Sequence, residues 1–311
     1  MCHTSLTARS LQLDLMALEV TSALREAGTP SLLLKGASFA EWLFGDGTPR
    51  PYSDCDILVA PDRIDAAGEV LEDLGLKQFP DYGPGEGVHD SHDQAWLRDD
   101  GLLELHFKVP GIQIPAKEAW QILMSDSMAI EISGRQVPVL GLDARALHLV
   151  LHADHHGVDT PTTLRDLTRA LRRLSDDDWA DVATLARRMD AEEGMSLGLR
   201  LLPDGVLIAD RLGLSSDVTS IDRALRQTES PPGARGLALA LDPYADETRK
   251  ARILSHLFPS SETMRINSTL ARRPRGGLQL AYAVRLANRF WQLPRAIIAV
   301  CRARQAVVRT R

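Results

Sequence analysis

Residues 32–59, LLLKGASFAEWLFGDGTPRPYSDCDILV, predict a strand, a glycine turn, a helix and a second strand in immediate succession. The apolar run at 31–35 ends at Gly36, and residues 37–44 then form a helical pattern that closes at Gly45-Asp46-Gly47. Residues 55–60 form the second short strand, and Pro61 opens an amphipathic helix that runs to Gly75. Strands that alternate with helices place this part of the chain in the α/β class.

Two carboxylates stand at the start of the second strand, in Asp54-Cys55-Asp56. Side chains two residues apart in a strand point to the same side, so Asp54 and Asp56 can share one cation. A lone pair of this kind is more often the acidic edge of a strand than a metal site. Glu104 changes that balance, because it lies in residues 102–109, where apolar residues alternate with mostly polar ones. If the two strands pair, three carboxylates can hold two divalent cations that bind phosphate oxygens.

The composition is that of a globular chain of 311 residues, with 44% hydrophobic and 25% charged residues and a formal net charge of −6. No apolar run approaches the ~18 residues of a membrane span, and the N-terminus lacks the pattern of a secretory signal. Cys2, Cys55 and Cys301 are too few and too scattered for a disulfide framework or a zinc knuckle. We therefore expect a cytoplasmic protein with free thiols and no integral membrane association.

The rest of the sequence predicts two hairpins and a long helical part. A helix is expected at 8–26, a loop rich in Gly, Pro, His and Asp at 81–93, and hairpin turns at Asp99-Asp100-Gly101 and Ser133-Gly134-Arg135. From Leu142 the pattern is helical almost to the end. We expect an α/β (α+β) fold with a mixed-sheet core over residues 1–140, followed by a mainly helical domain over residues 141–311.

Five motifs resemble those of the DNA polymerase beta-like nucleotidyltransferase superfamily, and within it a bacterial group of nucleotidyltransferase family proteins. They are Leu34-Lys35-Gly36 before a helix, Arg50-Pro51-Tyr52-Ser53-Asp54-Cys55-Asp56-Ile57-Leu58-Val59, Leu103-Glu104-Leu105-His106, Leu151-His152-Ala153-Asp154-His155-His156 with Leu164-Arg165-Asp166-Leu167, and Leu257-Phe258-Pro259-Ser260 with Met264-Arg265. Their order and spacing extend over most of the chain, so the match is more specific than any single motif.

The resemblance implies transfer of a nucleoside monophosphate from a nucleotide triphosphate, expected to be ATP, to an acceptor group, with pyrophosphate leaving. It implies that Asp54, Asp56 and Glu104 are catalytic and bind two Mg²⁺ ions, with Mn²⁺ as the alternative metal. The nucleotide-binding residues it implies are Lys35, Gly36, Ser38, Arg50, Ser53 and His106, with His152, His156 and Asp166 in a layer behind them. Phosphoryl chemistry depends on positioning and charge neutralisation, which such a set supplies.

One position departs from the superfamily pattern. Ala37 stands directly after the glycine, where many members have serine, and Ser38 follows one residue later. Lys35 and Arg50 can provide phosphate contacts instead, or each can be a solvated charge beside a turn.

The histidines allow two interpretations. His148, His152 and His156 recur every fourth residue and share one helix face, with His155 beside them. Such a face can bind zinc, but there is no H-E-x-x-H motif and no neighbouring Cys, so we favour a face that packs against the catalytic domain. His106 shares a strand face with Glu104, where it can contact the nucleotide or orient a carboxylate.

The charge is unevenly divided along the chain. Residues 263–311 contain 11 Arg and no acidic residue, whereas the first 262 residues hold 25 basic against 42 acidic side chains. Residues 278–300 predict an amphipathic helix that Pro294 breaks or kinks. We expect this helix to dock on the acidic body. Contact with an anionic membrane surface or with RNA is the alternative.

The sequence leaves the acceptor open between a small molecule such as an antibiotic or natural-product intermediate, a protein hydroxyl and an RNA end. It has no phosphate loop, dinucleotide-binding glycine motif or nucleophile elbow, which argues against P-loop kinases, Rossmann dehydrogenases and α/β-hydrolases. The alternative of another class is a non-catalytic nucleotide- or nucleic-acid-binding protein that retains the nucleotidyltransferase fold. Three mutually repelling carboxylates argue against it.

Overall fold

The computed structural model describes residues 3–46, 48–79, 92–99, 101–218, 220–228, 230–231, 233–241, 261, 264–265, 268 and 270–309. These residues form two compact units, the first within 3–79, 92–156 and 160–215 and the second within 157–159 and 216–309. Of the loop predicted at 81–93, only His92 and Asp93 are described. Residues 257–260 of the last sequence motif also lie outside the described residues.

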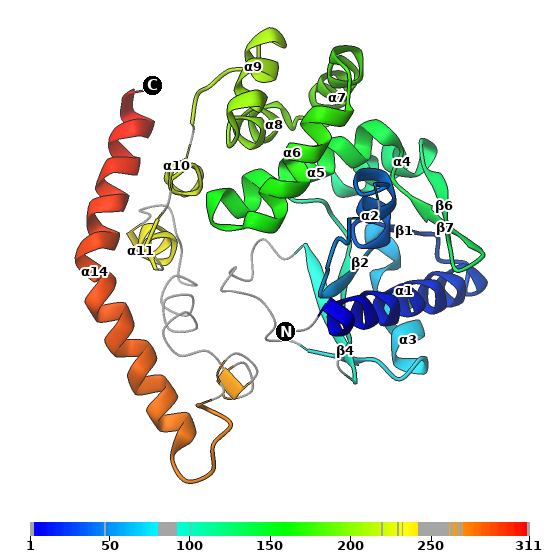
Figure 1. Ribbon diagram of the computed structural model, residues 1–311, viewed down its shortest axis with the longest axis horizontal. Coiled ribbons are helices and arrows are strands. Elements are labelled where there is room, and N and C mark those ends of the chain that lie inside the picture. Colours follow the sequence, from blue (N-terminus) through cyan, green and yellow to red (C-terminus); the bar gives the residue numbers. More distant parts are fainter. Residues whose placement is uncertain are drawn as a thin grey trace. The chain divides into compact units, whose positions relative to one another are not determined.

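A seven-stranded mixed sheet lies in the first unit, in the order β3-β4-β5-β2-β1-β7-β6 (Figure 1). The strands are β1 (Ser31–Leu33), β2 (Asp54–Val59), β3 (Lys77–Gln78), β4 (Asp93–Arg98), β5 (Gly101–His106), β6 (Met128–Ile132) and β7 (Arg135–Val139). β2 pairs in parallel with β5, and β1 in parallel with β7; the other neighbours are antiparallel. The predicted fold class is confirmed.

One face of the sheet packs against α1 (His3–Glu26) and α3 (Ile64–Asp73). Side chains of β2 and β5 that point to this face are apolar and buried: Cys55, Ile57, Val59, Leu103 and Leu105. Because successive side chains in a strand point to opposite faces, the remaining positions of β2 and β5 point the other way. That second face carries the polar residues of both strands.

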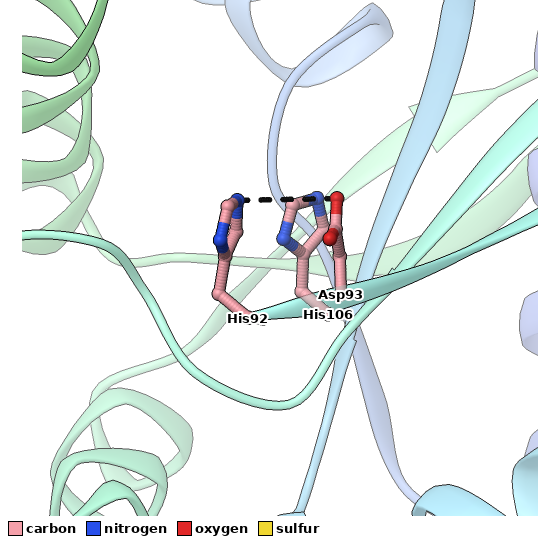
Figure 2. Close-up of side chains that lie close together, drawn as sticks. All are labelled: His92, Asp93 and His106. Carbon is pink, nitrogen blue, oxygen red and sulfur yellow. Dashed lines mark ion pairs between the residues drawn. The ribbon is translucent and has the colours of Figure 1, made fainter. Parts of the chain in front are cut away.

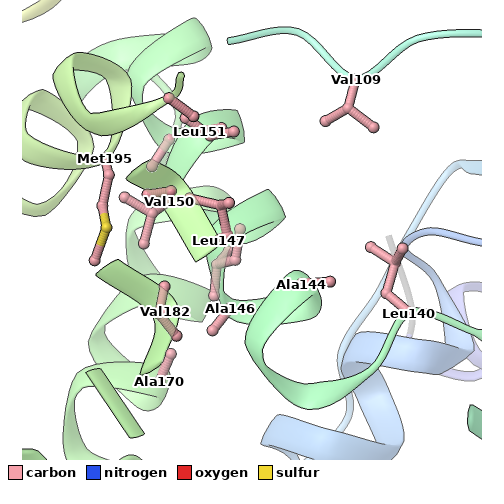
Figure 3. Close-up of a cluster of buried hydrophobic side chains, with 14 of the residues drawn as sticks. Val109, Leu140, Ala144, Ala146, Leu147, Val150, Leu151, Ala170, Val182 and Met195 are labelled. Carbon is pink, nitrogen blue, oxygen red and sulfur yellow. The ribbon is translucent and has the colours of Figure 1, made fainter. Parts of the chain in front are cut away.

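The second face packs against helices that share one hydrophobic core with it, part of which Figure 3 shows. These helices are α2 (Ala37–Leu43), α4 (Ala116–Ser125), α5 (Leu142–His156), α6 (Pro161–Arg173), α7 (Asp176–Arg188), α8 (Glu192–Leu199) and α9 (Pro203–Arg211). Leu32 and Leu58 of the sheet belong to the same core. The division predicted near residue 140, between catalytic core and helical domain, stays a prediction.

The predicted elements differ from the observed ones mainly in length. The strand expected at 102–109 is β5, and the helix expected at 61–75 is a 3₁₀ turn, η1 (Pro61–Arg63), followed by α3. Both hairpins form, with Arg98 opposite Gly101 in one and Ile132 opposite Arg135 in the other. Ser133 and Gly134 have φ of 49° and 79°, as the tight turn of a two-residue hairpin requires.

The second unit is helical and contains η2 (Gly157–Asp159), α10 (Ile221–Arg226), α11 (Ala234–Leu241) and α14 (Gly277–Arg309). α14 continues through Pro294 without ending there. Its small apolar side chains at positions 296, 300, 303 and 307 pack against α10 and α11. Docking of α14 on other acidic parts of the chain stays a prediction. None of the helices that the structure describes is both long and apolar enough to cross a membrane.

Candidate active site

The polar face of β2 and β5 gathers three carboxylates. Parallel pairing places Asp56 directly opposite Glu104, and Asp54 opposite Leu102. Alternation then puts Asp54, Asp56, Glu104 and His106 on one face of the sheet, which we call the carboxylate face. The condition stated from the sequence, that the two strands pair, is met.

Two cationic side chains hold these carboxylates together. Lys35 Nζ lies 2.5 Å from Asp56 Oδ1, at the end of β1. His106 Nε2 lies 3.2 Å from the same oxygen and 3.6 Å from Glu104 Oε2. Asp56 is 1% exposed and His106 4%, so these charges meet away from water. Buried charges persist only when they are paired in this way.

The pKa values reflect this pairing. Burial alone would raise the pKa of Asp56, but the charge of Lys35 and the His106 hydrogen bond outweigh it and hold that pKa below its usual range. Burial opposes the charge of His106, yet hydrogen bonds to Asp56 and Glu104 raise its pKa to about 9. Burial and the neighbouring Asp56 raise the pKa of Asp54 to about 6. The two aspartates therefore differ in how readily they bind a proton.

The carboxylate face can hold a cation. Asp56 Oδ2 is buried and has no hydrogen-bond partner among the described residues, so one lone pair of this carboxylate is left for a ligand. Ligand atoms of Asp56, Glu104 and His106 lie within 4.8 Å of one another. Asp54 is not part of that group, although it lies on the same face. Carboxylate oxygens are the donors that Mg²⁺ and Mn²⁺ take in proteins, so Asp56 and Glu104 fit the predicted metal.

A glycine turn stands beside this face. Gly36 precedes α2 with φ 60° and ψ −122°, a conformation that L side chains rarely adopt. Arg50 donates to the Gly36 carbonyl from Nη1 at 3.4 Å, and to Asp166 Oδ2 from Nε at 2.9 Å. Arg50 also lies over the Phe39 ring at 5.3 Å. Arg50 and Asp166, which the sequence places in separate roles, therefore form one link between α6 and the turn.

The two predicted serine contacts lie in different surroundings. Ser38 is fully buried, and its Oγ has no hydrogen-bond partner in the described part of the chain. Its carbonyl accepts from Arg145 Nη1 at 3.4 Å. Ser53 is exposed, and its carbonyl accepts from Arg9 Nη2 at 3.2 Å. The roles predicted for Ser38 and Ser53 in nucleotide binding stay predictions.

One side of α5 carries the predicted histidines, which we call the histidine face: His148, His152, His155 and His156. The ring centroids of His148 and His152 lie 6.1 Å apart, and those of His152 and His156 lie 4.3 Å apart. The row runs from His148, which is buried, to His156, which is exposed.

The histidine face lies close to the carboxylate face, and its residues His148 and His152 stay neutral. Burial, and then the positive charge of Lys35, lower the pKa of His148 to about 3. The same two causes hold the pKa of His152 well below its usual value. Neither ring nitrogen of His148 has a hydrogen-bond partner within the described ranges. His148 is therefore a neutral imidazole against the Phe39 ring, 6.0 Å away.

Two polar residues at this site were not singled out from the sequence. Asp93 lies directly opposite His106 across β4 and β5, and His92 precedes it. The sequence could have predicted this pair from the hairpin turn that follows Arg98. A two-residue turn places Arg98 opposite Gly101, and the same antiparallel register then places Asp93 opposite His106.

Comparison with known proteins bears on this geometry. A family model described as uncharacterised nucleotidyltransferase matches residues 3–204. No curated protein matches the chain. Among solved structures, the antibiotic-resistance factor ANT(2'')-Ia in solution is 18% identical, over 59% of this chain and 95% of that chain, with a TM-score of 0.41. The crystal structure of ANT(2'')-Ia in complex with adenylyl-2''-tobramycin is also 18% identical, over 58% of this chain and 97% of that chain, with a TM-score of 0.39. An antigenic nucleotidyltransferase-like protein from Paracoccidioides brasiliensis is 15% identical, over 59% of this chain and 91% of that chain, with a TM-score of 0.36.

The family match covers more than half of the chain, including all the residues of the carboxylate face. It confirms the predicted nucleotidyltransferase family and the predicted enzyme class. The protein therefore belongs to the family of uncharacterised nucleotidyltransferases and is a transferase of nucleotidyl groups.

Proposed function

We propose that the protein moves a nucleoside monophosphate from a nucleotide triphosphate, expected to be ATP, to an acceptor group, and that the carboxylate face is the catalytic centre. The observation that carries the proposal is the parallel register of β2 and β5, which sets Asp56 against Glu104 with Asp54 on the same face. In the reaction, the acceptor atom bonds to the α-phosphorus and loses its proton. The bond from that phosphorus to the bridging oxygen breaks, and its electron pair leaves with pyrophosphate.

Asp54, Asp56 and Glu104 are the residues that would hold the metal, two Mg²⁺ ions or Mn²⁺ in their place. Bound there, such ions would neutralise the charge of the triphosphate and of the leaving pyrophosphate. Lys35 already supplies one positive charge at Asp56 Oδ1, and the unpartnered Oδ2 is the lone-pair donor that remains. This donor set supports a metal-dependent reaction.

The other side chains would bind and orient the substrates. Lys35 is 12% exposed and can reach a phosphate oxygen from the turn at Gly36, where no side chain stands between backbone and ligand. Arg50 holds that turn through Asp166. Glu104 is 20% exposed against 1% for Asp56, so it is the better placed to accept the acceptor proton. The acceptor is a small molecule, a protein hydroxyl or an RNA group.

The test is a mass-spectrometric search for nucleotide adducts after incubation of the protein with each nucleotide triphosphate, Mg²⁺ and a cell extract. We expect products that gain one nucleoside monophosphate and that disappear with a chelator. The matched control is Asp54→Asn, which replaces one oxygen by an amide nitrogen at nearly unchanged volume. The same adducts from this variant at the same yield would contradict the proposal.

We also propose that α14 contacts an anionic lipid surface. Phe290 and Trp291 are 78% and 83% exposed, which is unusual for aromatic side chains. Further large apolar residues of α14 that are exposed are Leu280, Val284, Leu293, Ile297, Ile298 and Val308. Arg295 and Arg302 are exposed too, and they follow Trp291 and Ile298 by four residues, on the same side of the helix. An aromatic and apolar stripe with flanking Arg favours a lipid surface over RNA.

Sedimentation with vesicles of phosphatidylcholine, with and without phosphatidylglycerol, tests this contact. We expect the full chain to sediment with the anionic vesicles only, and the double variant Phe290→Ala, Trp291→Ala to stay in solution. Leu207→Ala is the matched control, because Leu207 is an exposed apolar residue of α9. Retardation of RNA without vesicle binding would replace lipid by RNA as the partner.

A further inference from the structure

A second group of potential metal ligands lies next to the carboxylate face, at the start of β4 and the end of β5. One ring nitrogen each of His92 and His106 and a carboxylate oxygen of Asp93 lie within 4.8 Å of one another. His92 Nε2 is 3.9 Å from Asp93 Oδ2, and the rings of His92 and His106 stack with centroids 5.7 Å apart. Figure 2 shows the three side chains side by side, rising from neighbouring strands.

The backbone fixes this arrangement. Asp93 and His106 are directly opposite residues of an antiparallel pair, so their side chains point to the same face of the sheet. His92 is held by its carbonyl, which accepts from Phe107 N at 3.0 Å. Ligands at about 2.0–2.1 Å from a tetrahedral ion are separated by about 3.4 Å.

His106 has one ring nitrogen to offer. Nε2 contacts the Asp56 and Glu104 carboxylates, whereas Nδ1 is buried with no hydrogen-bond partner among the residues described. Histidines that bind a metal almost always donate their other ring N–H to a carboxylate or another acceptor, which fixes the ring. His106 has that second contact, so an ion that displaces the Nδ1 proton can bind at Nδ1 while Nε2 keeps its carboxylate contacts.

A further imidazole lies beside His92, outside the group of three. The ring of His155, on the histidine face of α5, lies edge-on to the His92 ring with centroids 5.8 Å apart. Three imidazoles and one carboxylate suit a borderline ion such as Zn²⁺ or Co²⁺. An all-carboxylate set, by contrast, suits Mg²⁺.

We propose that His92, Asp93 and His106 bind a divalent transition-metal ion of the Zn²⁺ class, with His155 as the fourth ligand. This site is separate from the cations held by Asp54, Asp56 and Glu104, and it does not depend on the proposed transfer reaction. The bound ion holds His106 in place, and His106 in turn orients Asp56. The two metal sites therefore meet at one imidazole.

Cobalt(II) titration of the metal-free full chain, followed by visible absorption, tests the site. We expect one equivalent of Co²⁺ to produce the intense d–d bands of four-coordinate cobalt, and one equivalent of Zn²⁺ to displace it. His92→Ala and Asp93→Asn should each weaken Co²⁺ binding by at least about tenfold. Loss of a residue that only hydrogen-bonds to a metal ligand already lowers metal affinity by about that factor. His155→Ala should change the bands toward higher coordination as water replaces the imidazole.

Two matched variants separate this site from its neighbours. His156→Ala removes a histidine that is near His155 but outside the ligand set, and it should leave the cobalt spectrum unchanged. Asp54→Asn disables the carboxylate face and should also leave the spectrum unchanged, so failure of nucleotidyl transfer and failure of this site are distinguishable.

Unaltered Co²⁺ affinity in both His92→Ala and Asp93→Asn would overturn the proposal. Loss of the bands in Asp54→Asn alone would do so as well, by assigning the ion to the carboxylate face. Asp93→Asn changes the shape of the side chain very little, so this variant still tests the site if His92→Ala fails to fold.

Discussion

The carboxylate face and the histidine face lie in the same unit, but buried titratable side chains are charged on the first, as Asp56 is, and neutral on the second, as His148 is. On the carboxylate face, Asp56 stays charged because Lys35 and His106 compensate it. On the histidine face, His148 has no such partner within the described residues and stays neutral. Two histidines of similar burial thus have pKa values of about 9 and about 3. The partner, more than the burial, decides the charge of each side chain.

Asp56→Asn is expected to have the largest effect on this difference. The substitution leaves Lys35 buried beside an uncharged amide, and removing one partner of a buried ion pair costs about 3–5 kcal/mol of unfolding free energy. Asp54→Asn should leave stability at pH 8 unchanged or higher, because burial and Asp56 raise the pKa of Asp54 to about 6 and so disfavour its charge. Urea denaturation measures both. Equal destabilisation by the two variants would show that Lys35 is not tied to Asp56.

Both aspartate variants should also lose nucleotidyl transfer, by about a thousandfold or more if each carboxylate contributes on the order of 4 kcal/mol to the transition state. Pyrophosphate release in the presence of extract measures this loss. A variant that keeps wild-type transfer would remove its aspartate from the catalytic set.

His106 should stabilise the metal-free protein below neutral pH and lose that effect in base. Its folded pKa of about 9 lies above the unfolded value near 6.5. Protonated His106 therefore contributes its full stabilisation, about 3 kcal/mol of unfolding free energy, below about pH 6.5. This stabilisation is lost as the pH rises through 9. Unfolding free energies measured between pH 6 and 9.5 with a chelator should decline in the wild type. In His106→Gln that decline should be smaller.

His148 should show the reverse dependence. Its folded pKa of about 3 lies below the unfolded value, so acid favours the unfolded state and stability falls as the pH drops below 6.5. At pH 5 the loss is about 2 kcal/mol relative to pH 7.5. His148→Leu keeps the volume and removes the titrating group, so this part of the acid sensitivity should vanish. An unchanged pH profile in His148→Leu would place the titration elsewhere.

Gly36→Ala should have the smallest effect and should act on the turn that joins the two faces. Gly36 follows Lys35 and precedes α2, whose Phe39 contacts His148. A Cβ at Gly36 would meet only the Tyr52 ring at 3.6 Å, an ordinary contact, so the cost is backbone strain of about 1–2 kcal/mol. Thermal unfolding checks the strain, and nucleotide binding checks the turn. A variant of wild-type stability would mean that the turn tolerates another conformation.

The three carboxylates could be found from the sequence because their placement depends on short-range rules. Alternation with a period of two puts Asp54 and Asp56 on one side of their strand. The apolar residues that alternate with Glu104 show that Glu104 lies on the opposite, polar side of its own strand. Pairing of β2 with β5 had to be assumed, since parallel register is set by packing. The links of Lys35 to Asp56 and of Arg50 to Asp166 join elements far apart in the chain, so no local pattern reveals them.

The remaining differences are differences of length and partner. β1 spans only Ser31–Leu33, whereas the apolar run in the sequence extends over 31–35, and it lies between β2 and β7. The acceptor cannot be inferred from residue types, because no motif in the sequence is specific for one class of acceptor.

The strand order also has a consequence for how this protein can change. The chain leaves β2 and returns in β5 through β3 and β4, which lie at one end of the sheet. An insertion between β3 and β4 lengthens a connection at the edge and leaves Asp56 opposite Glu104. An insertion in the turn between β4 and β5 slides Asp93 away from His106 and still preserves the β2–β5 register. A single insertion or deletion in that turn could thus separate Asp93 from His106 while Asp56 stays opposite Glu104.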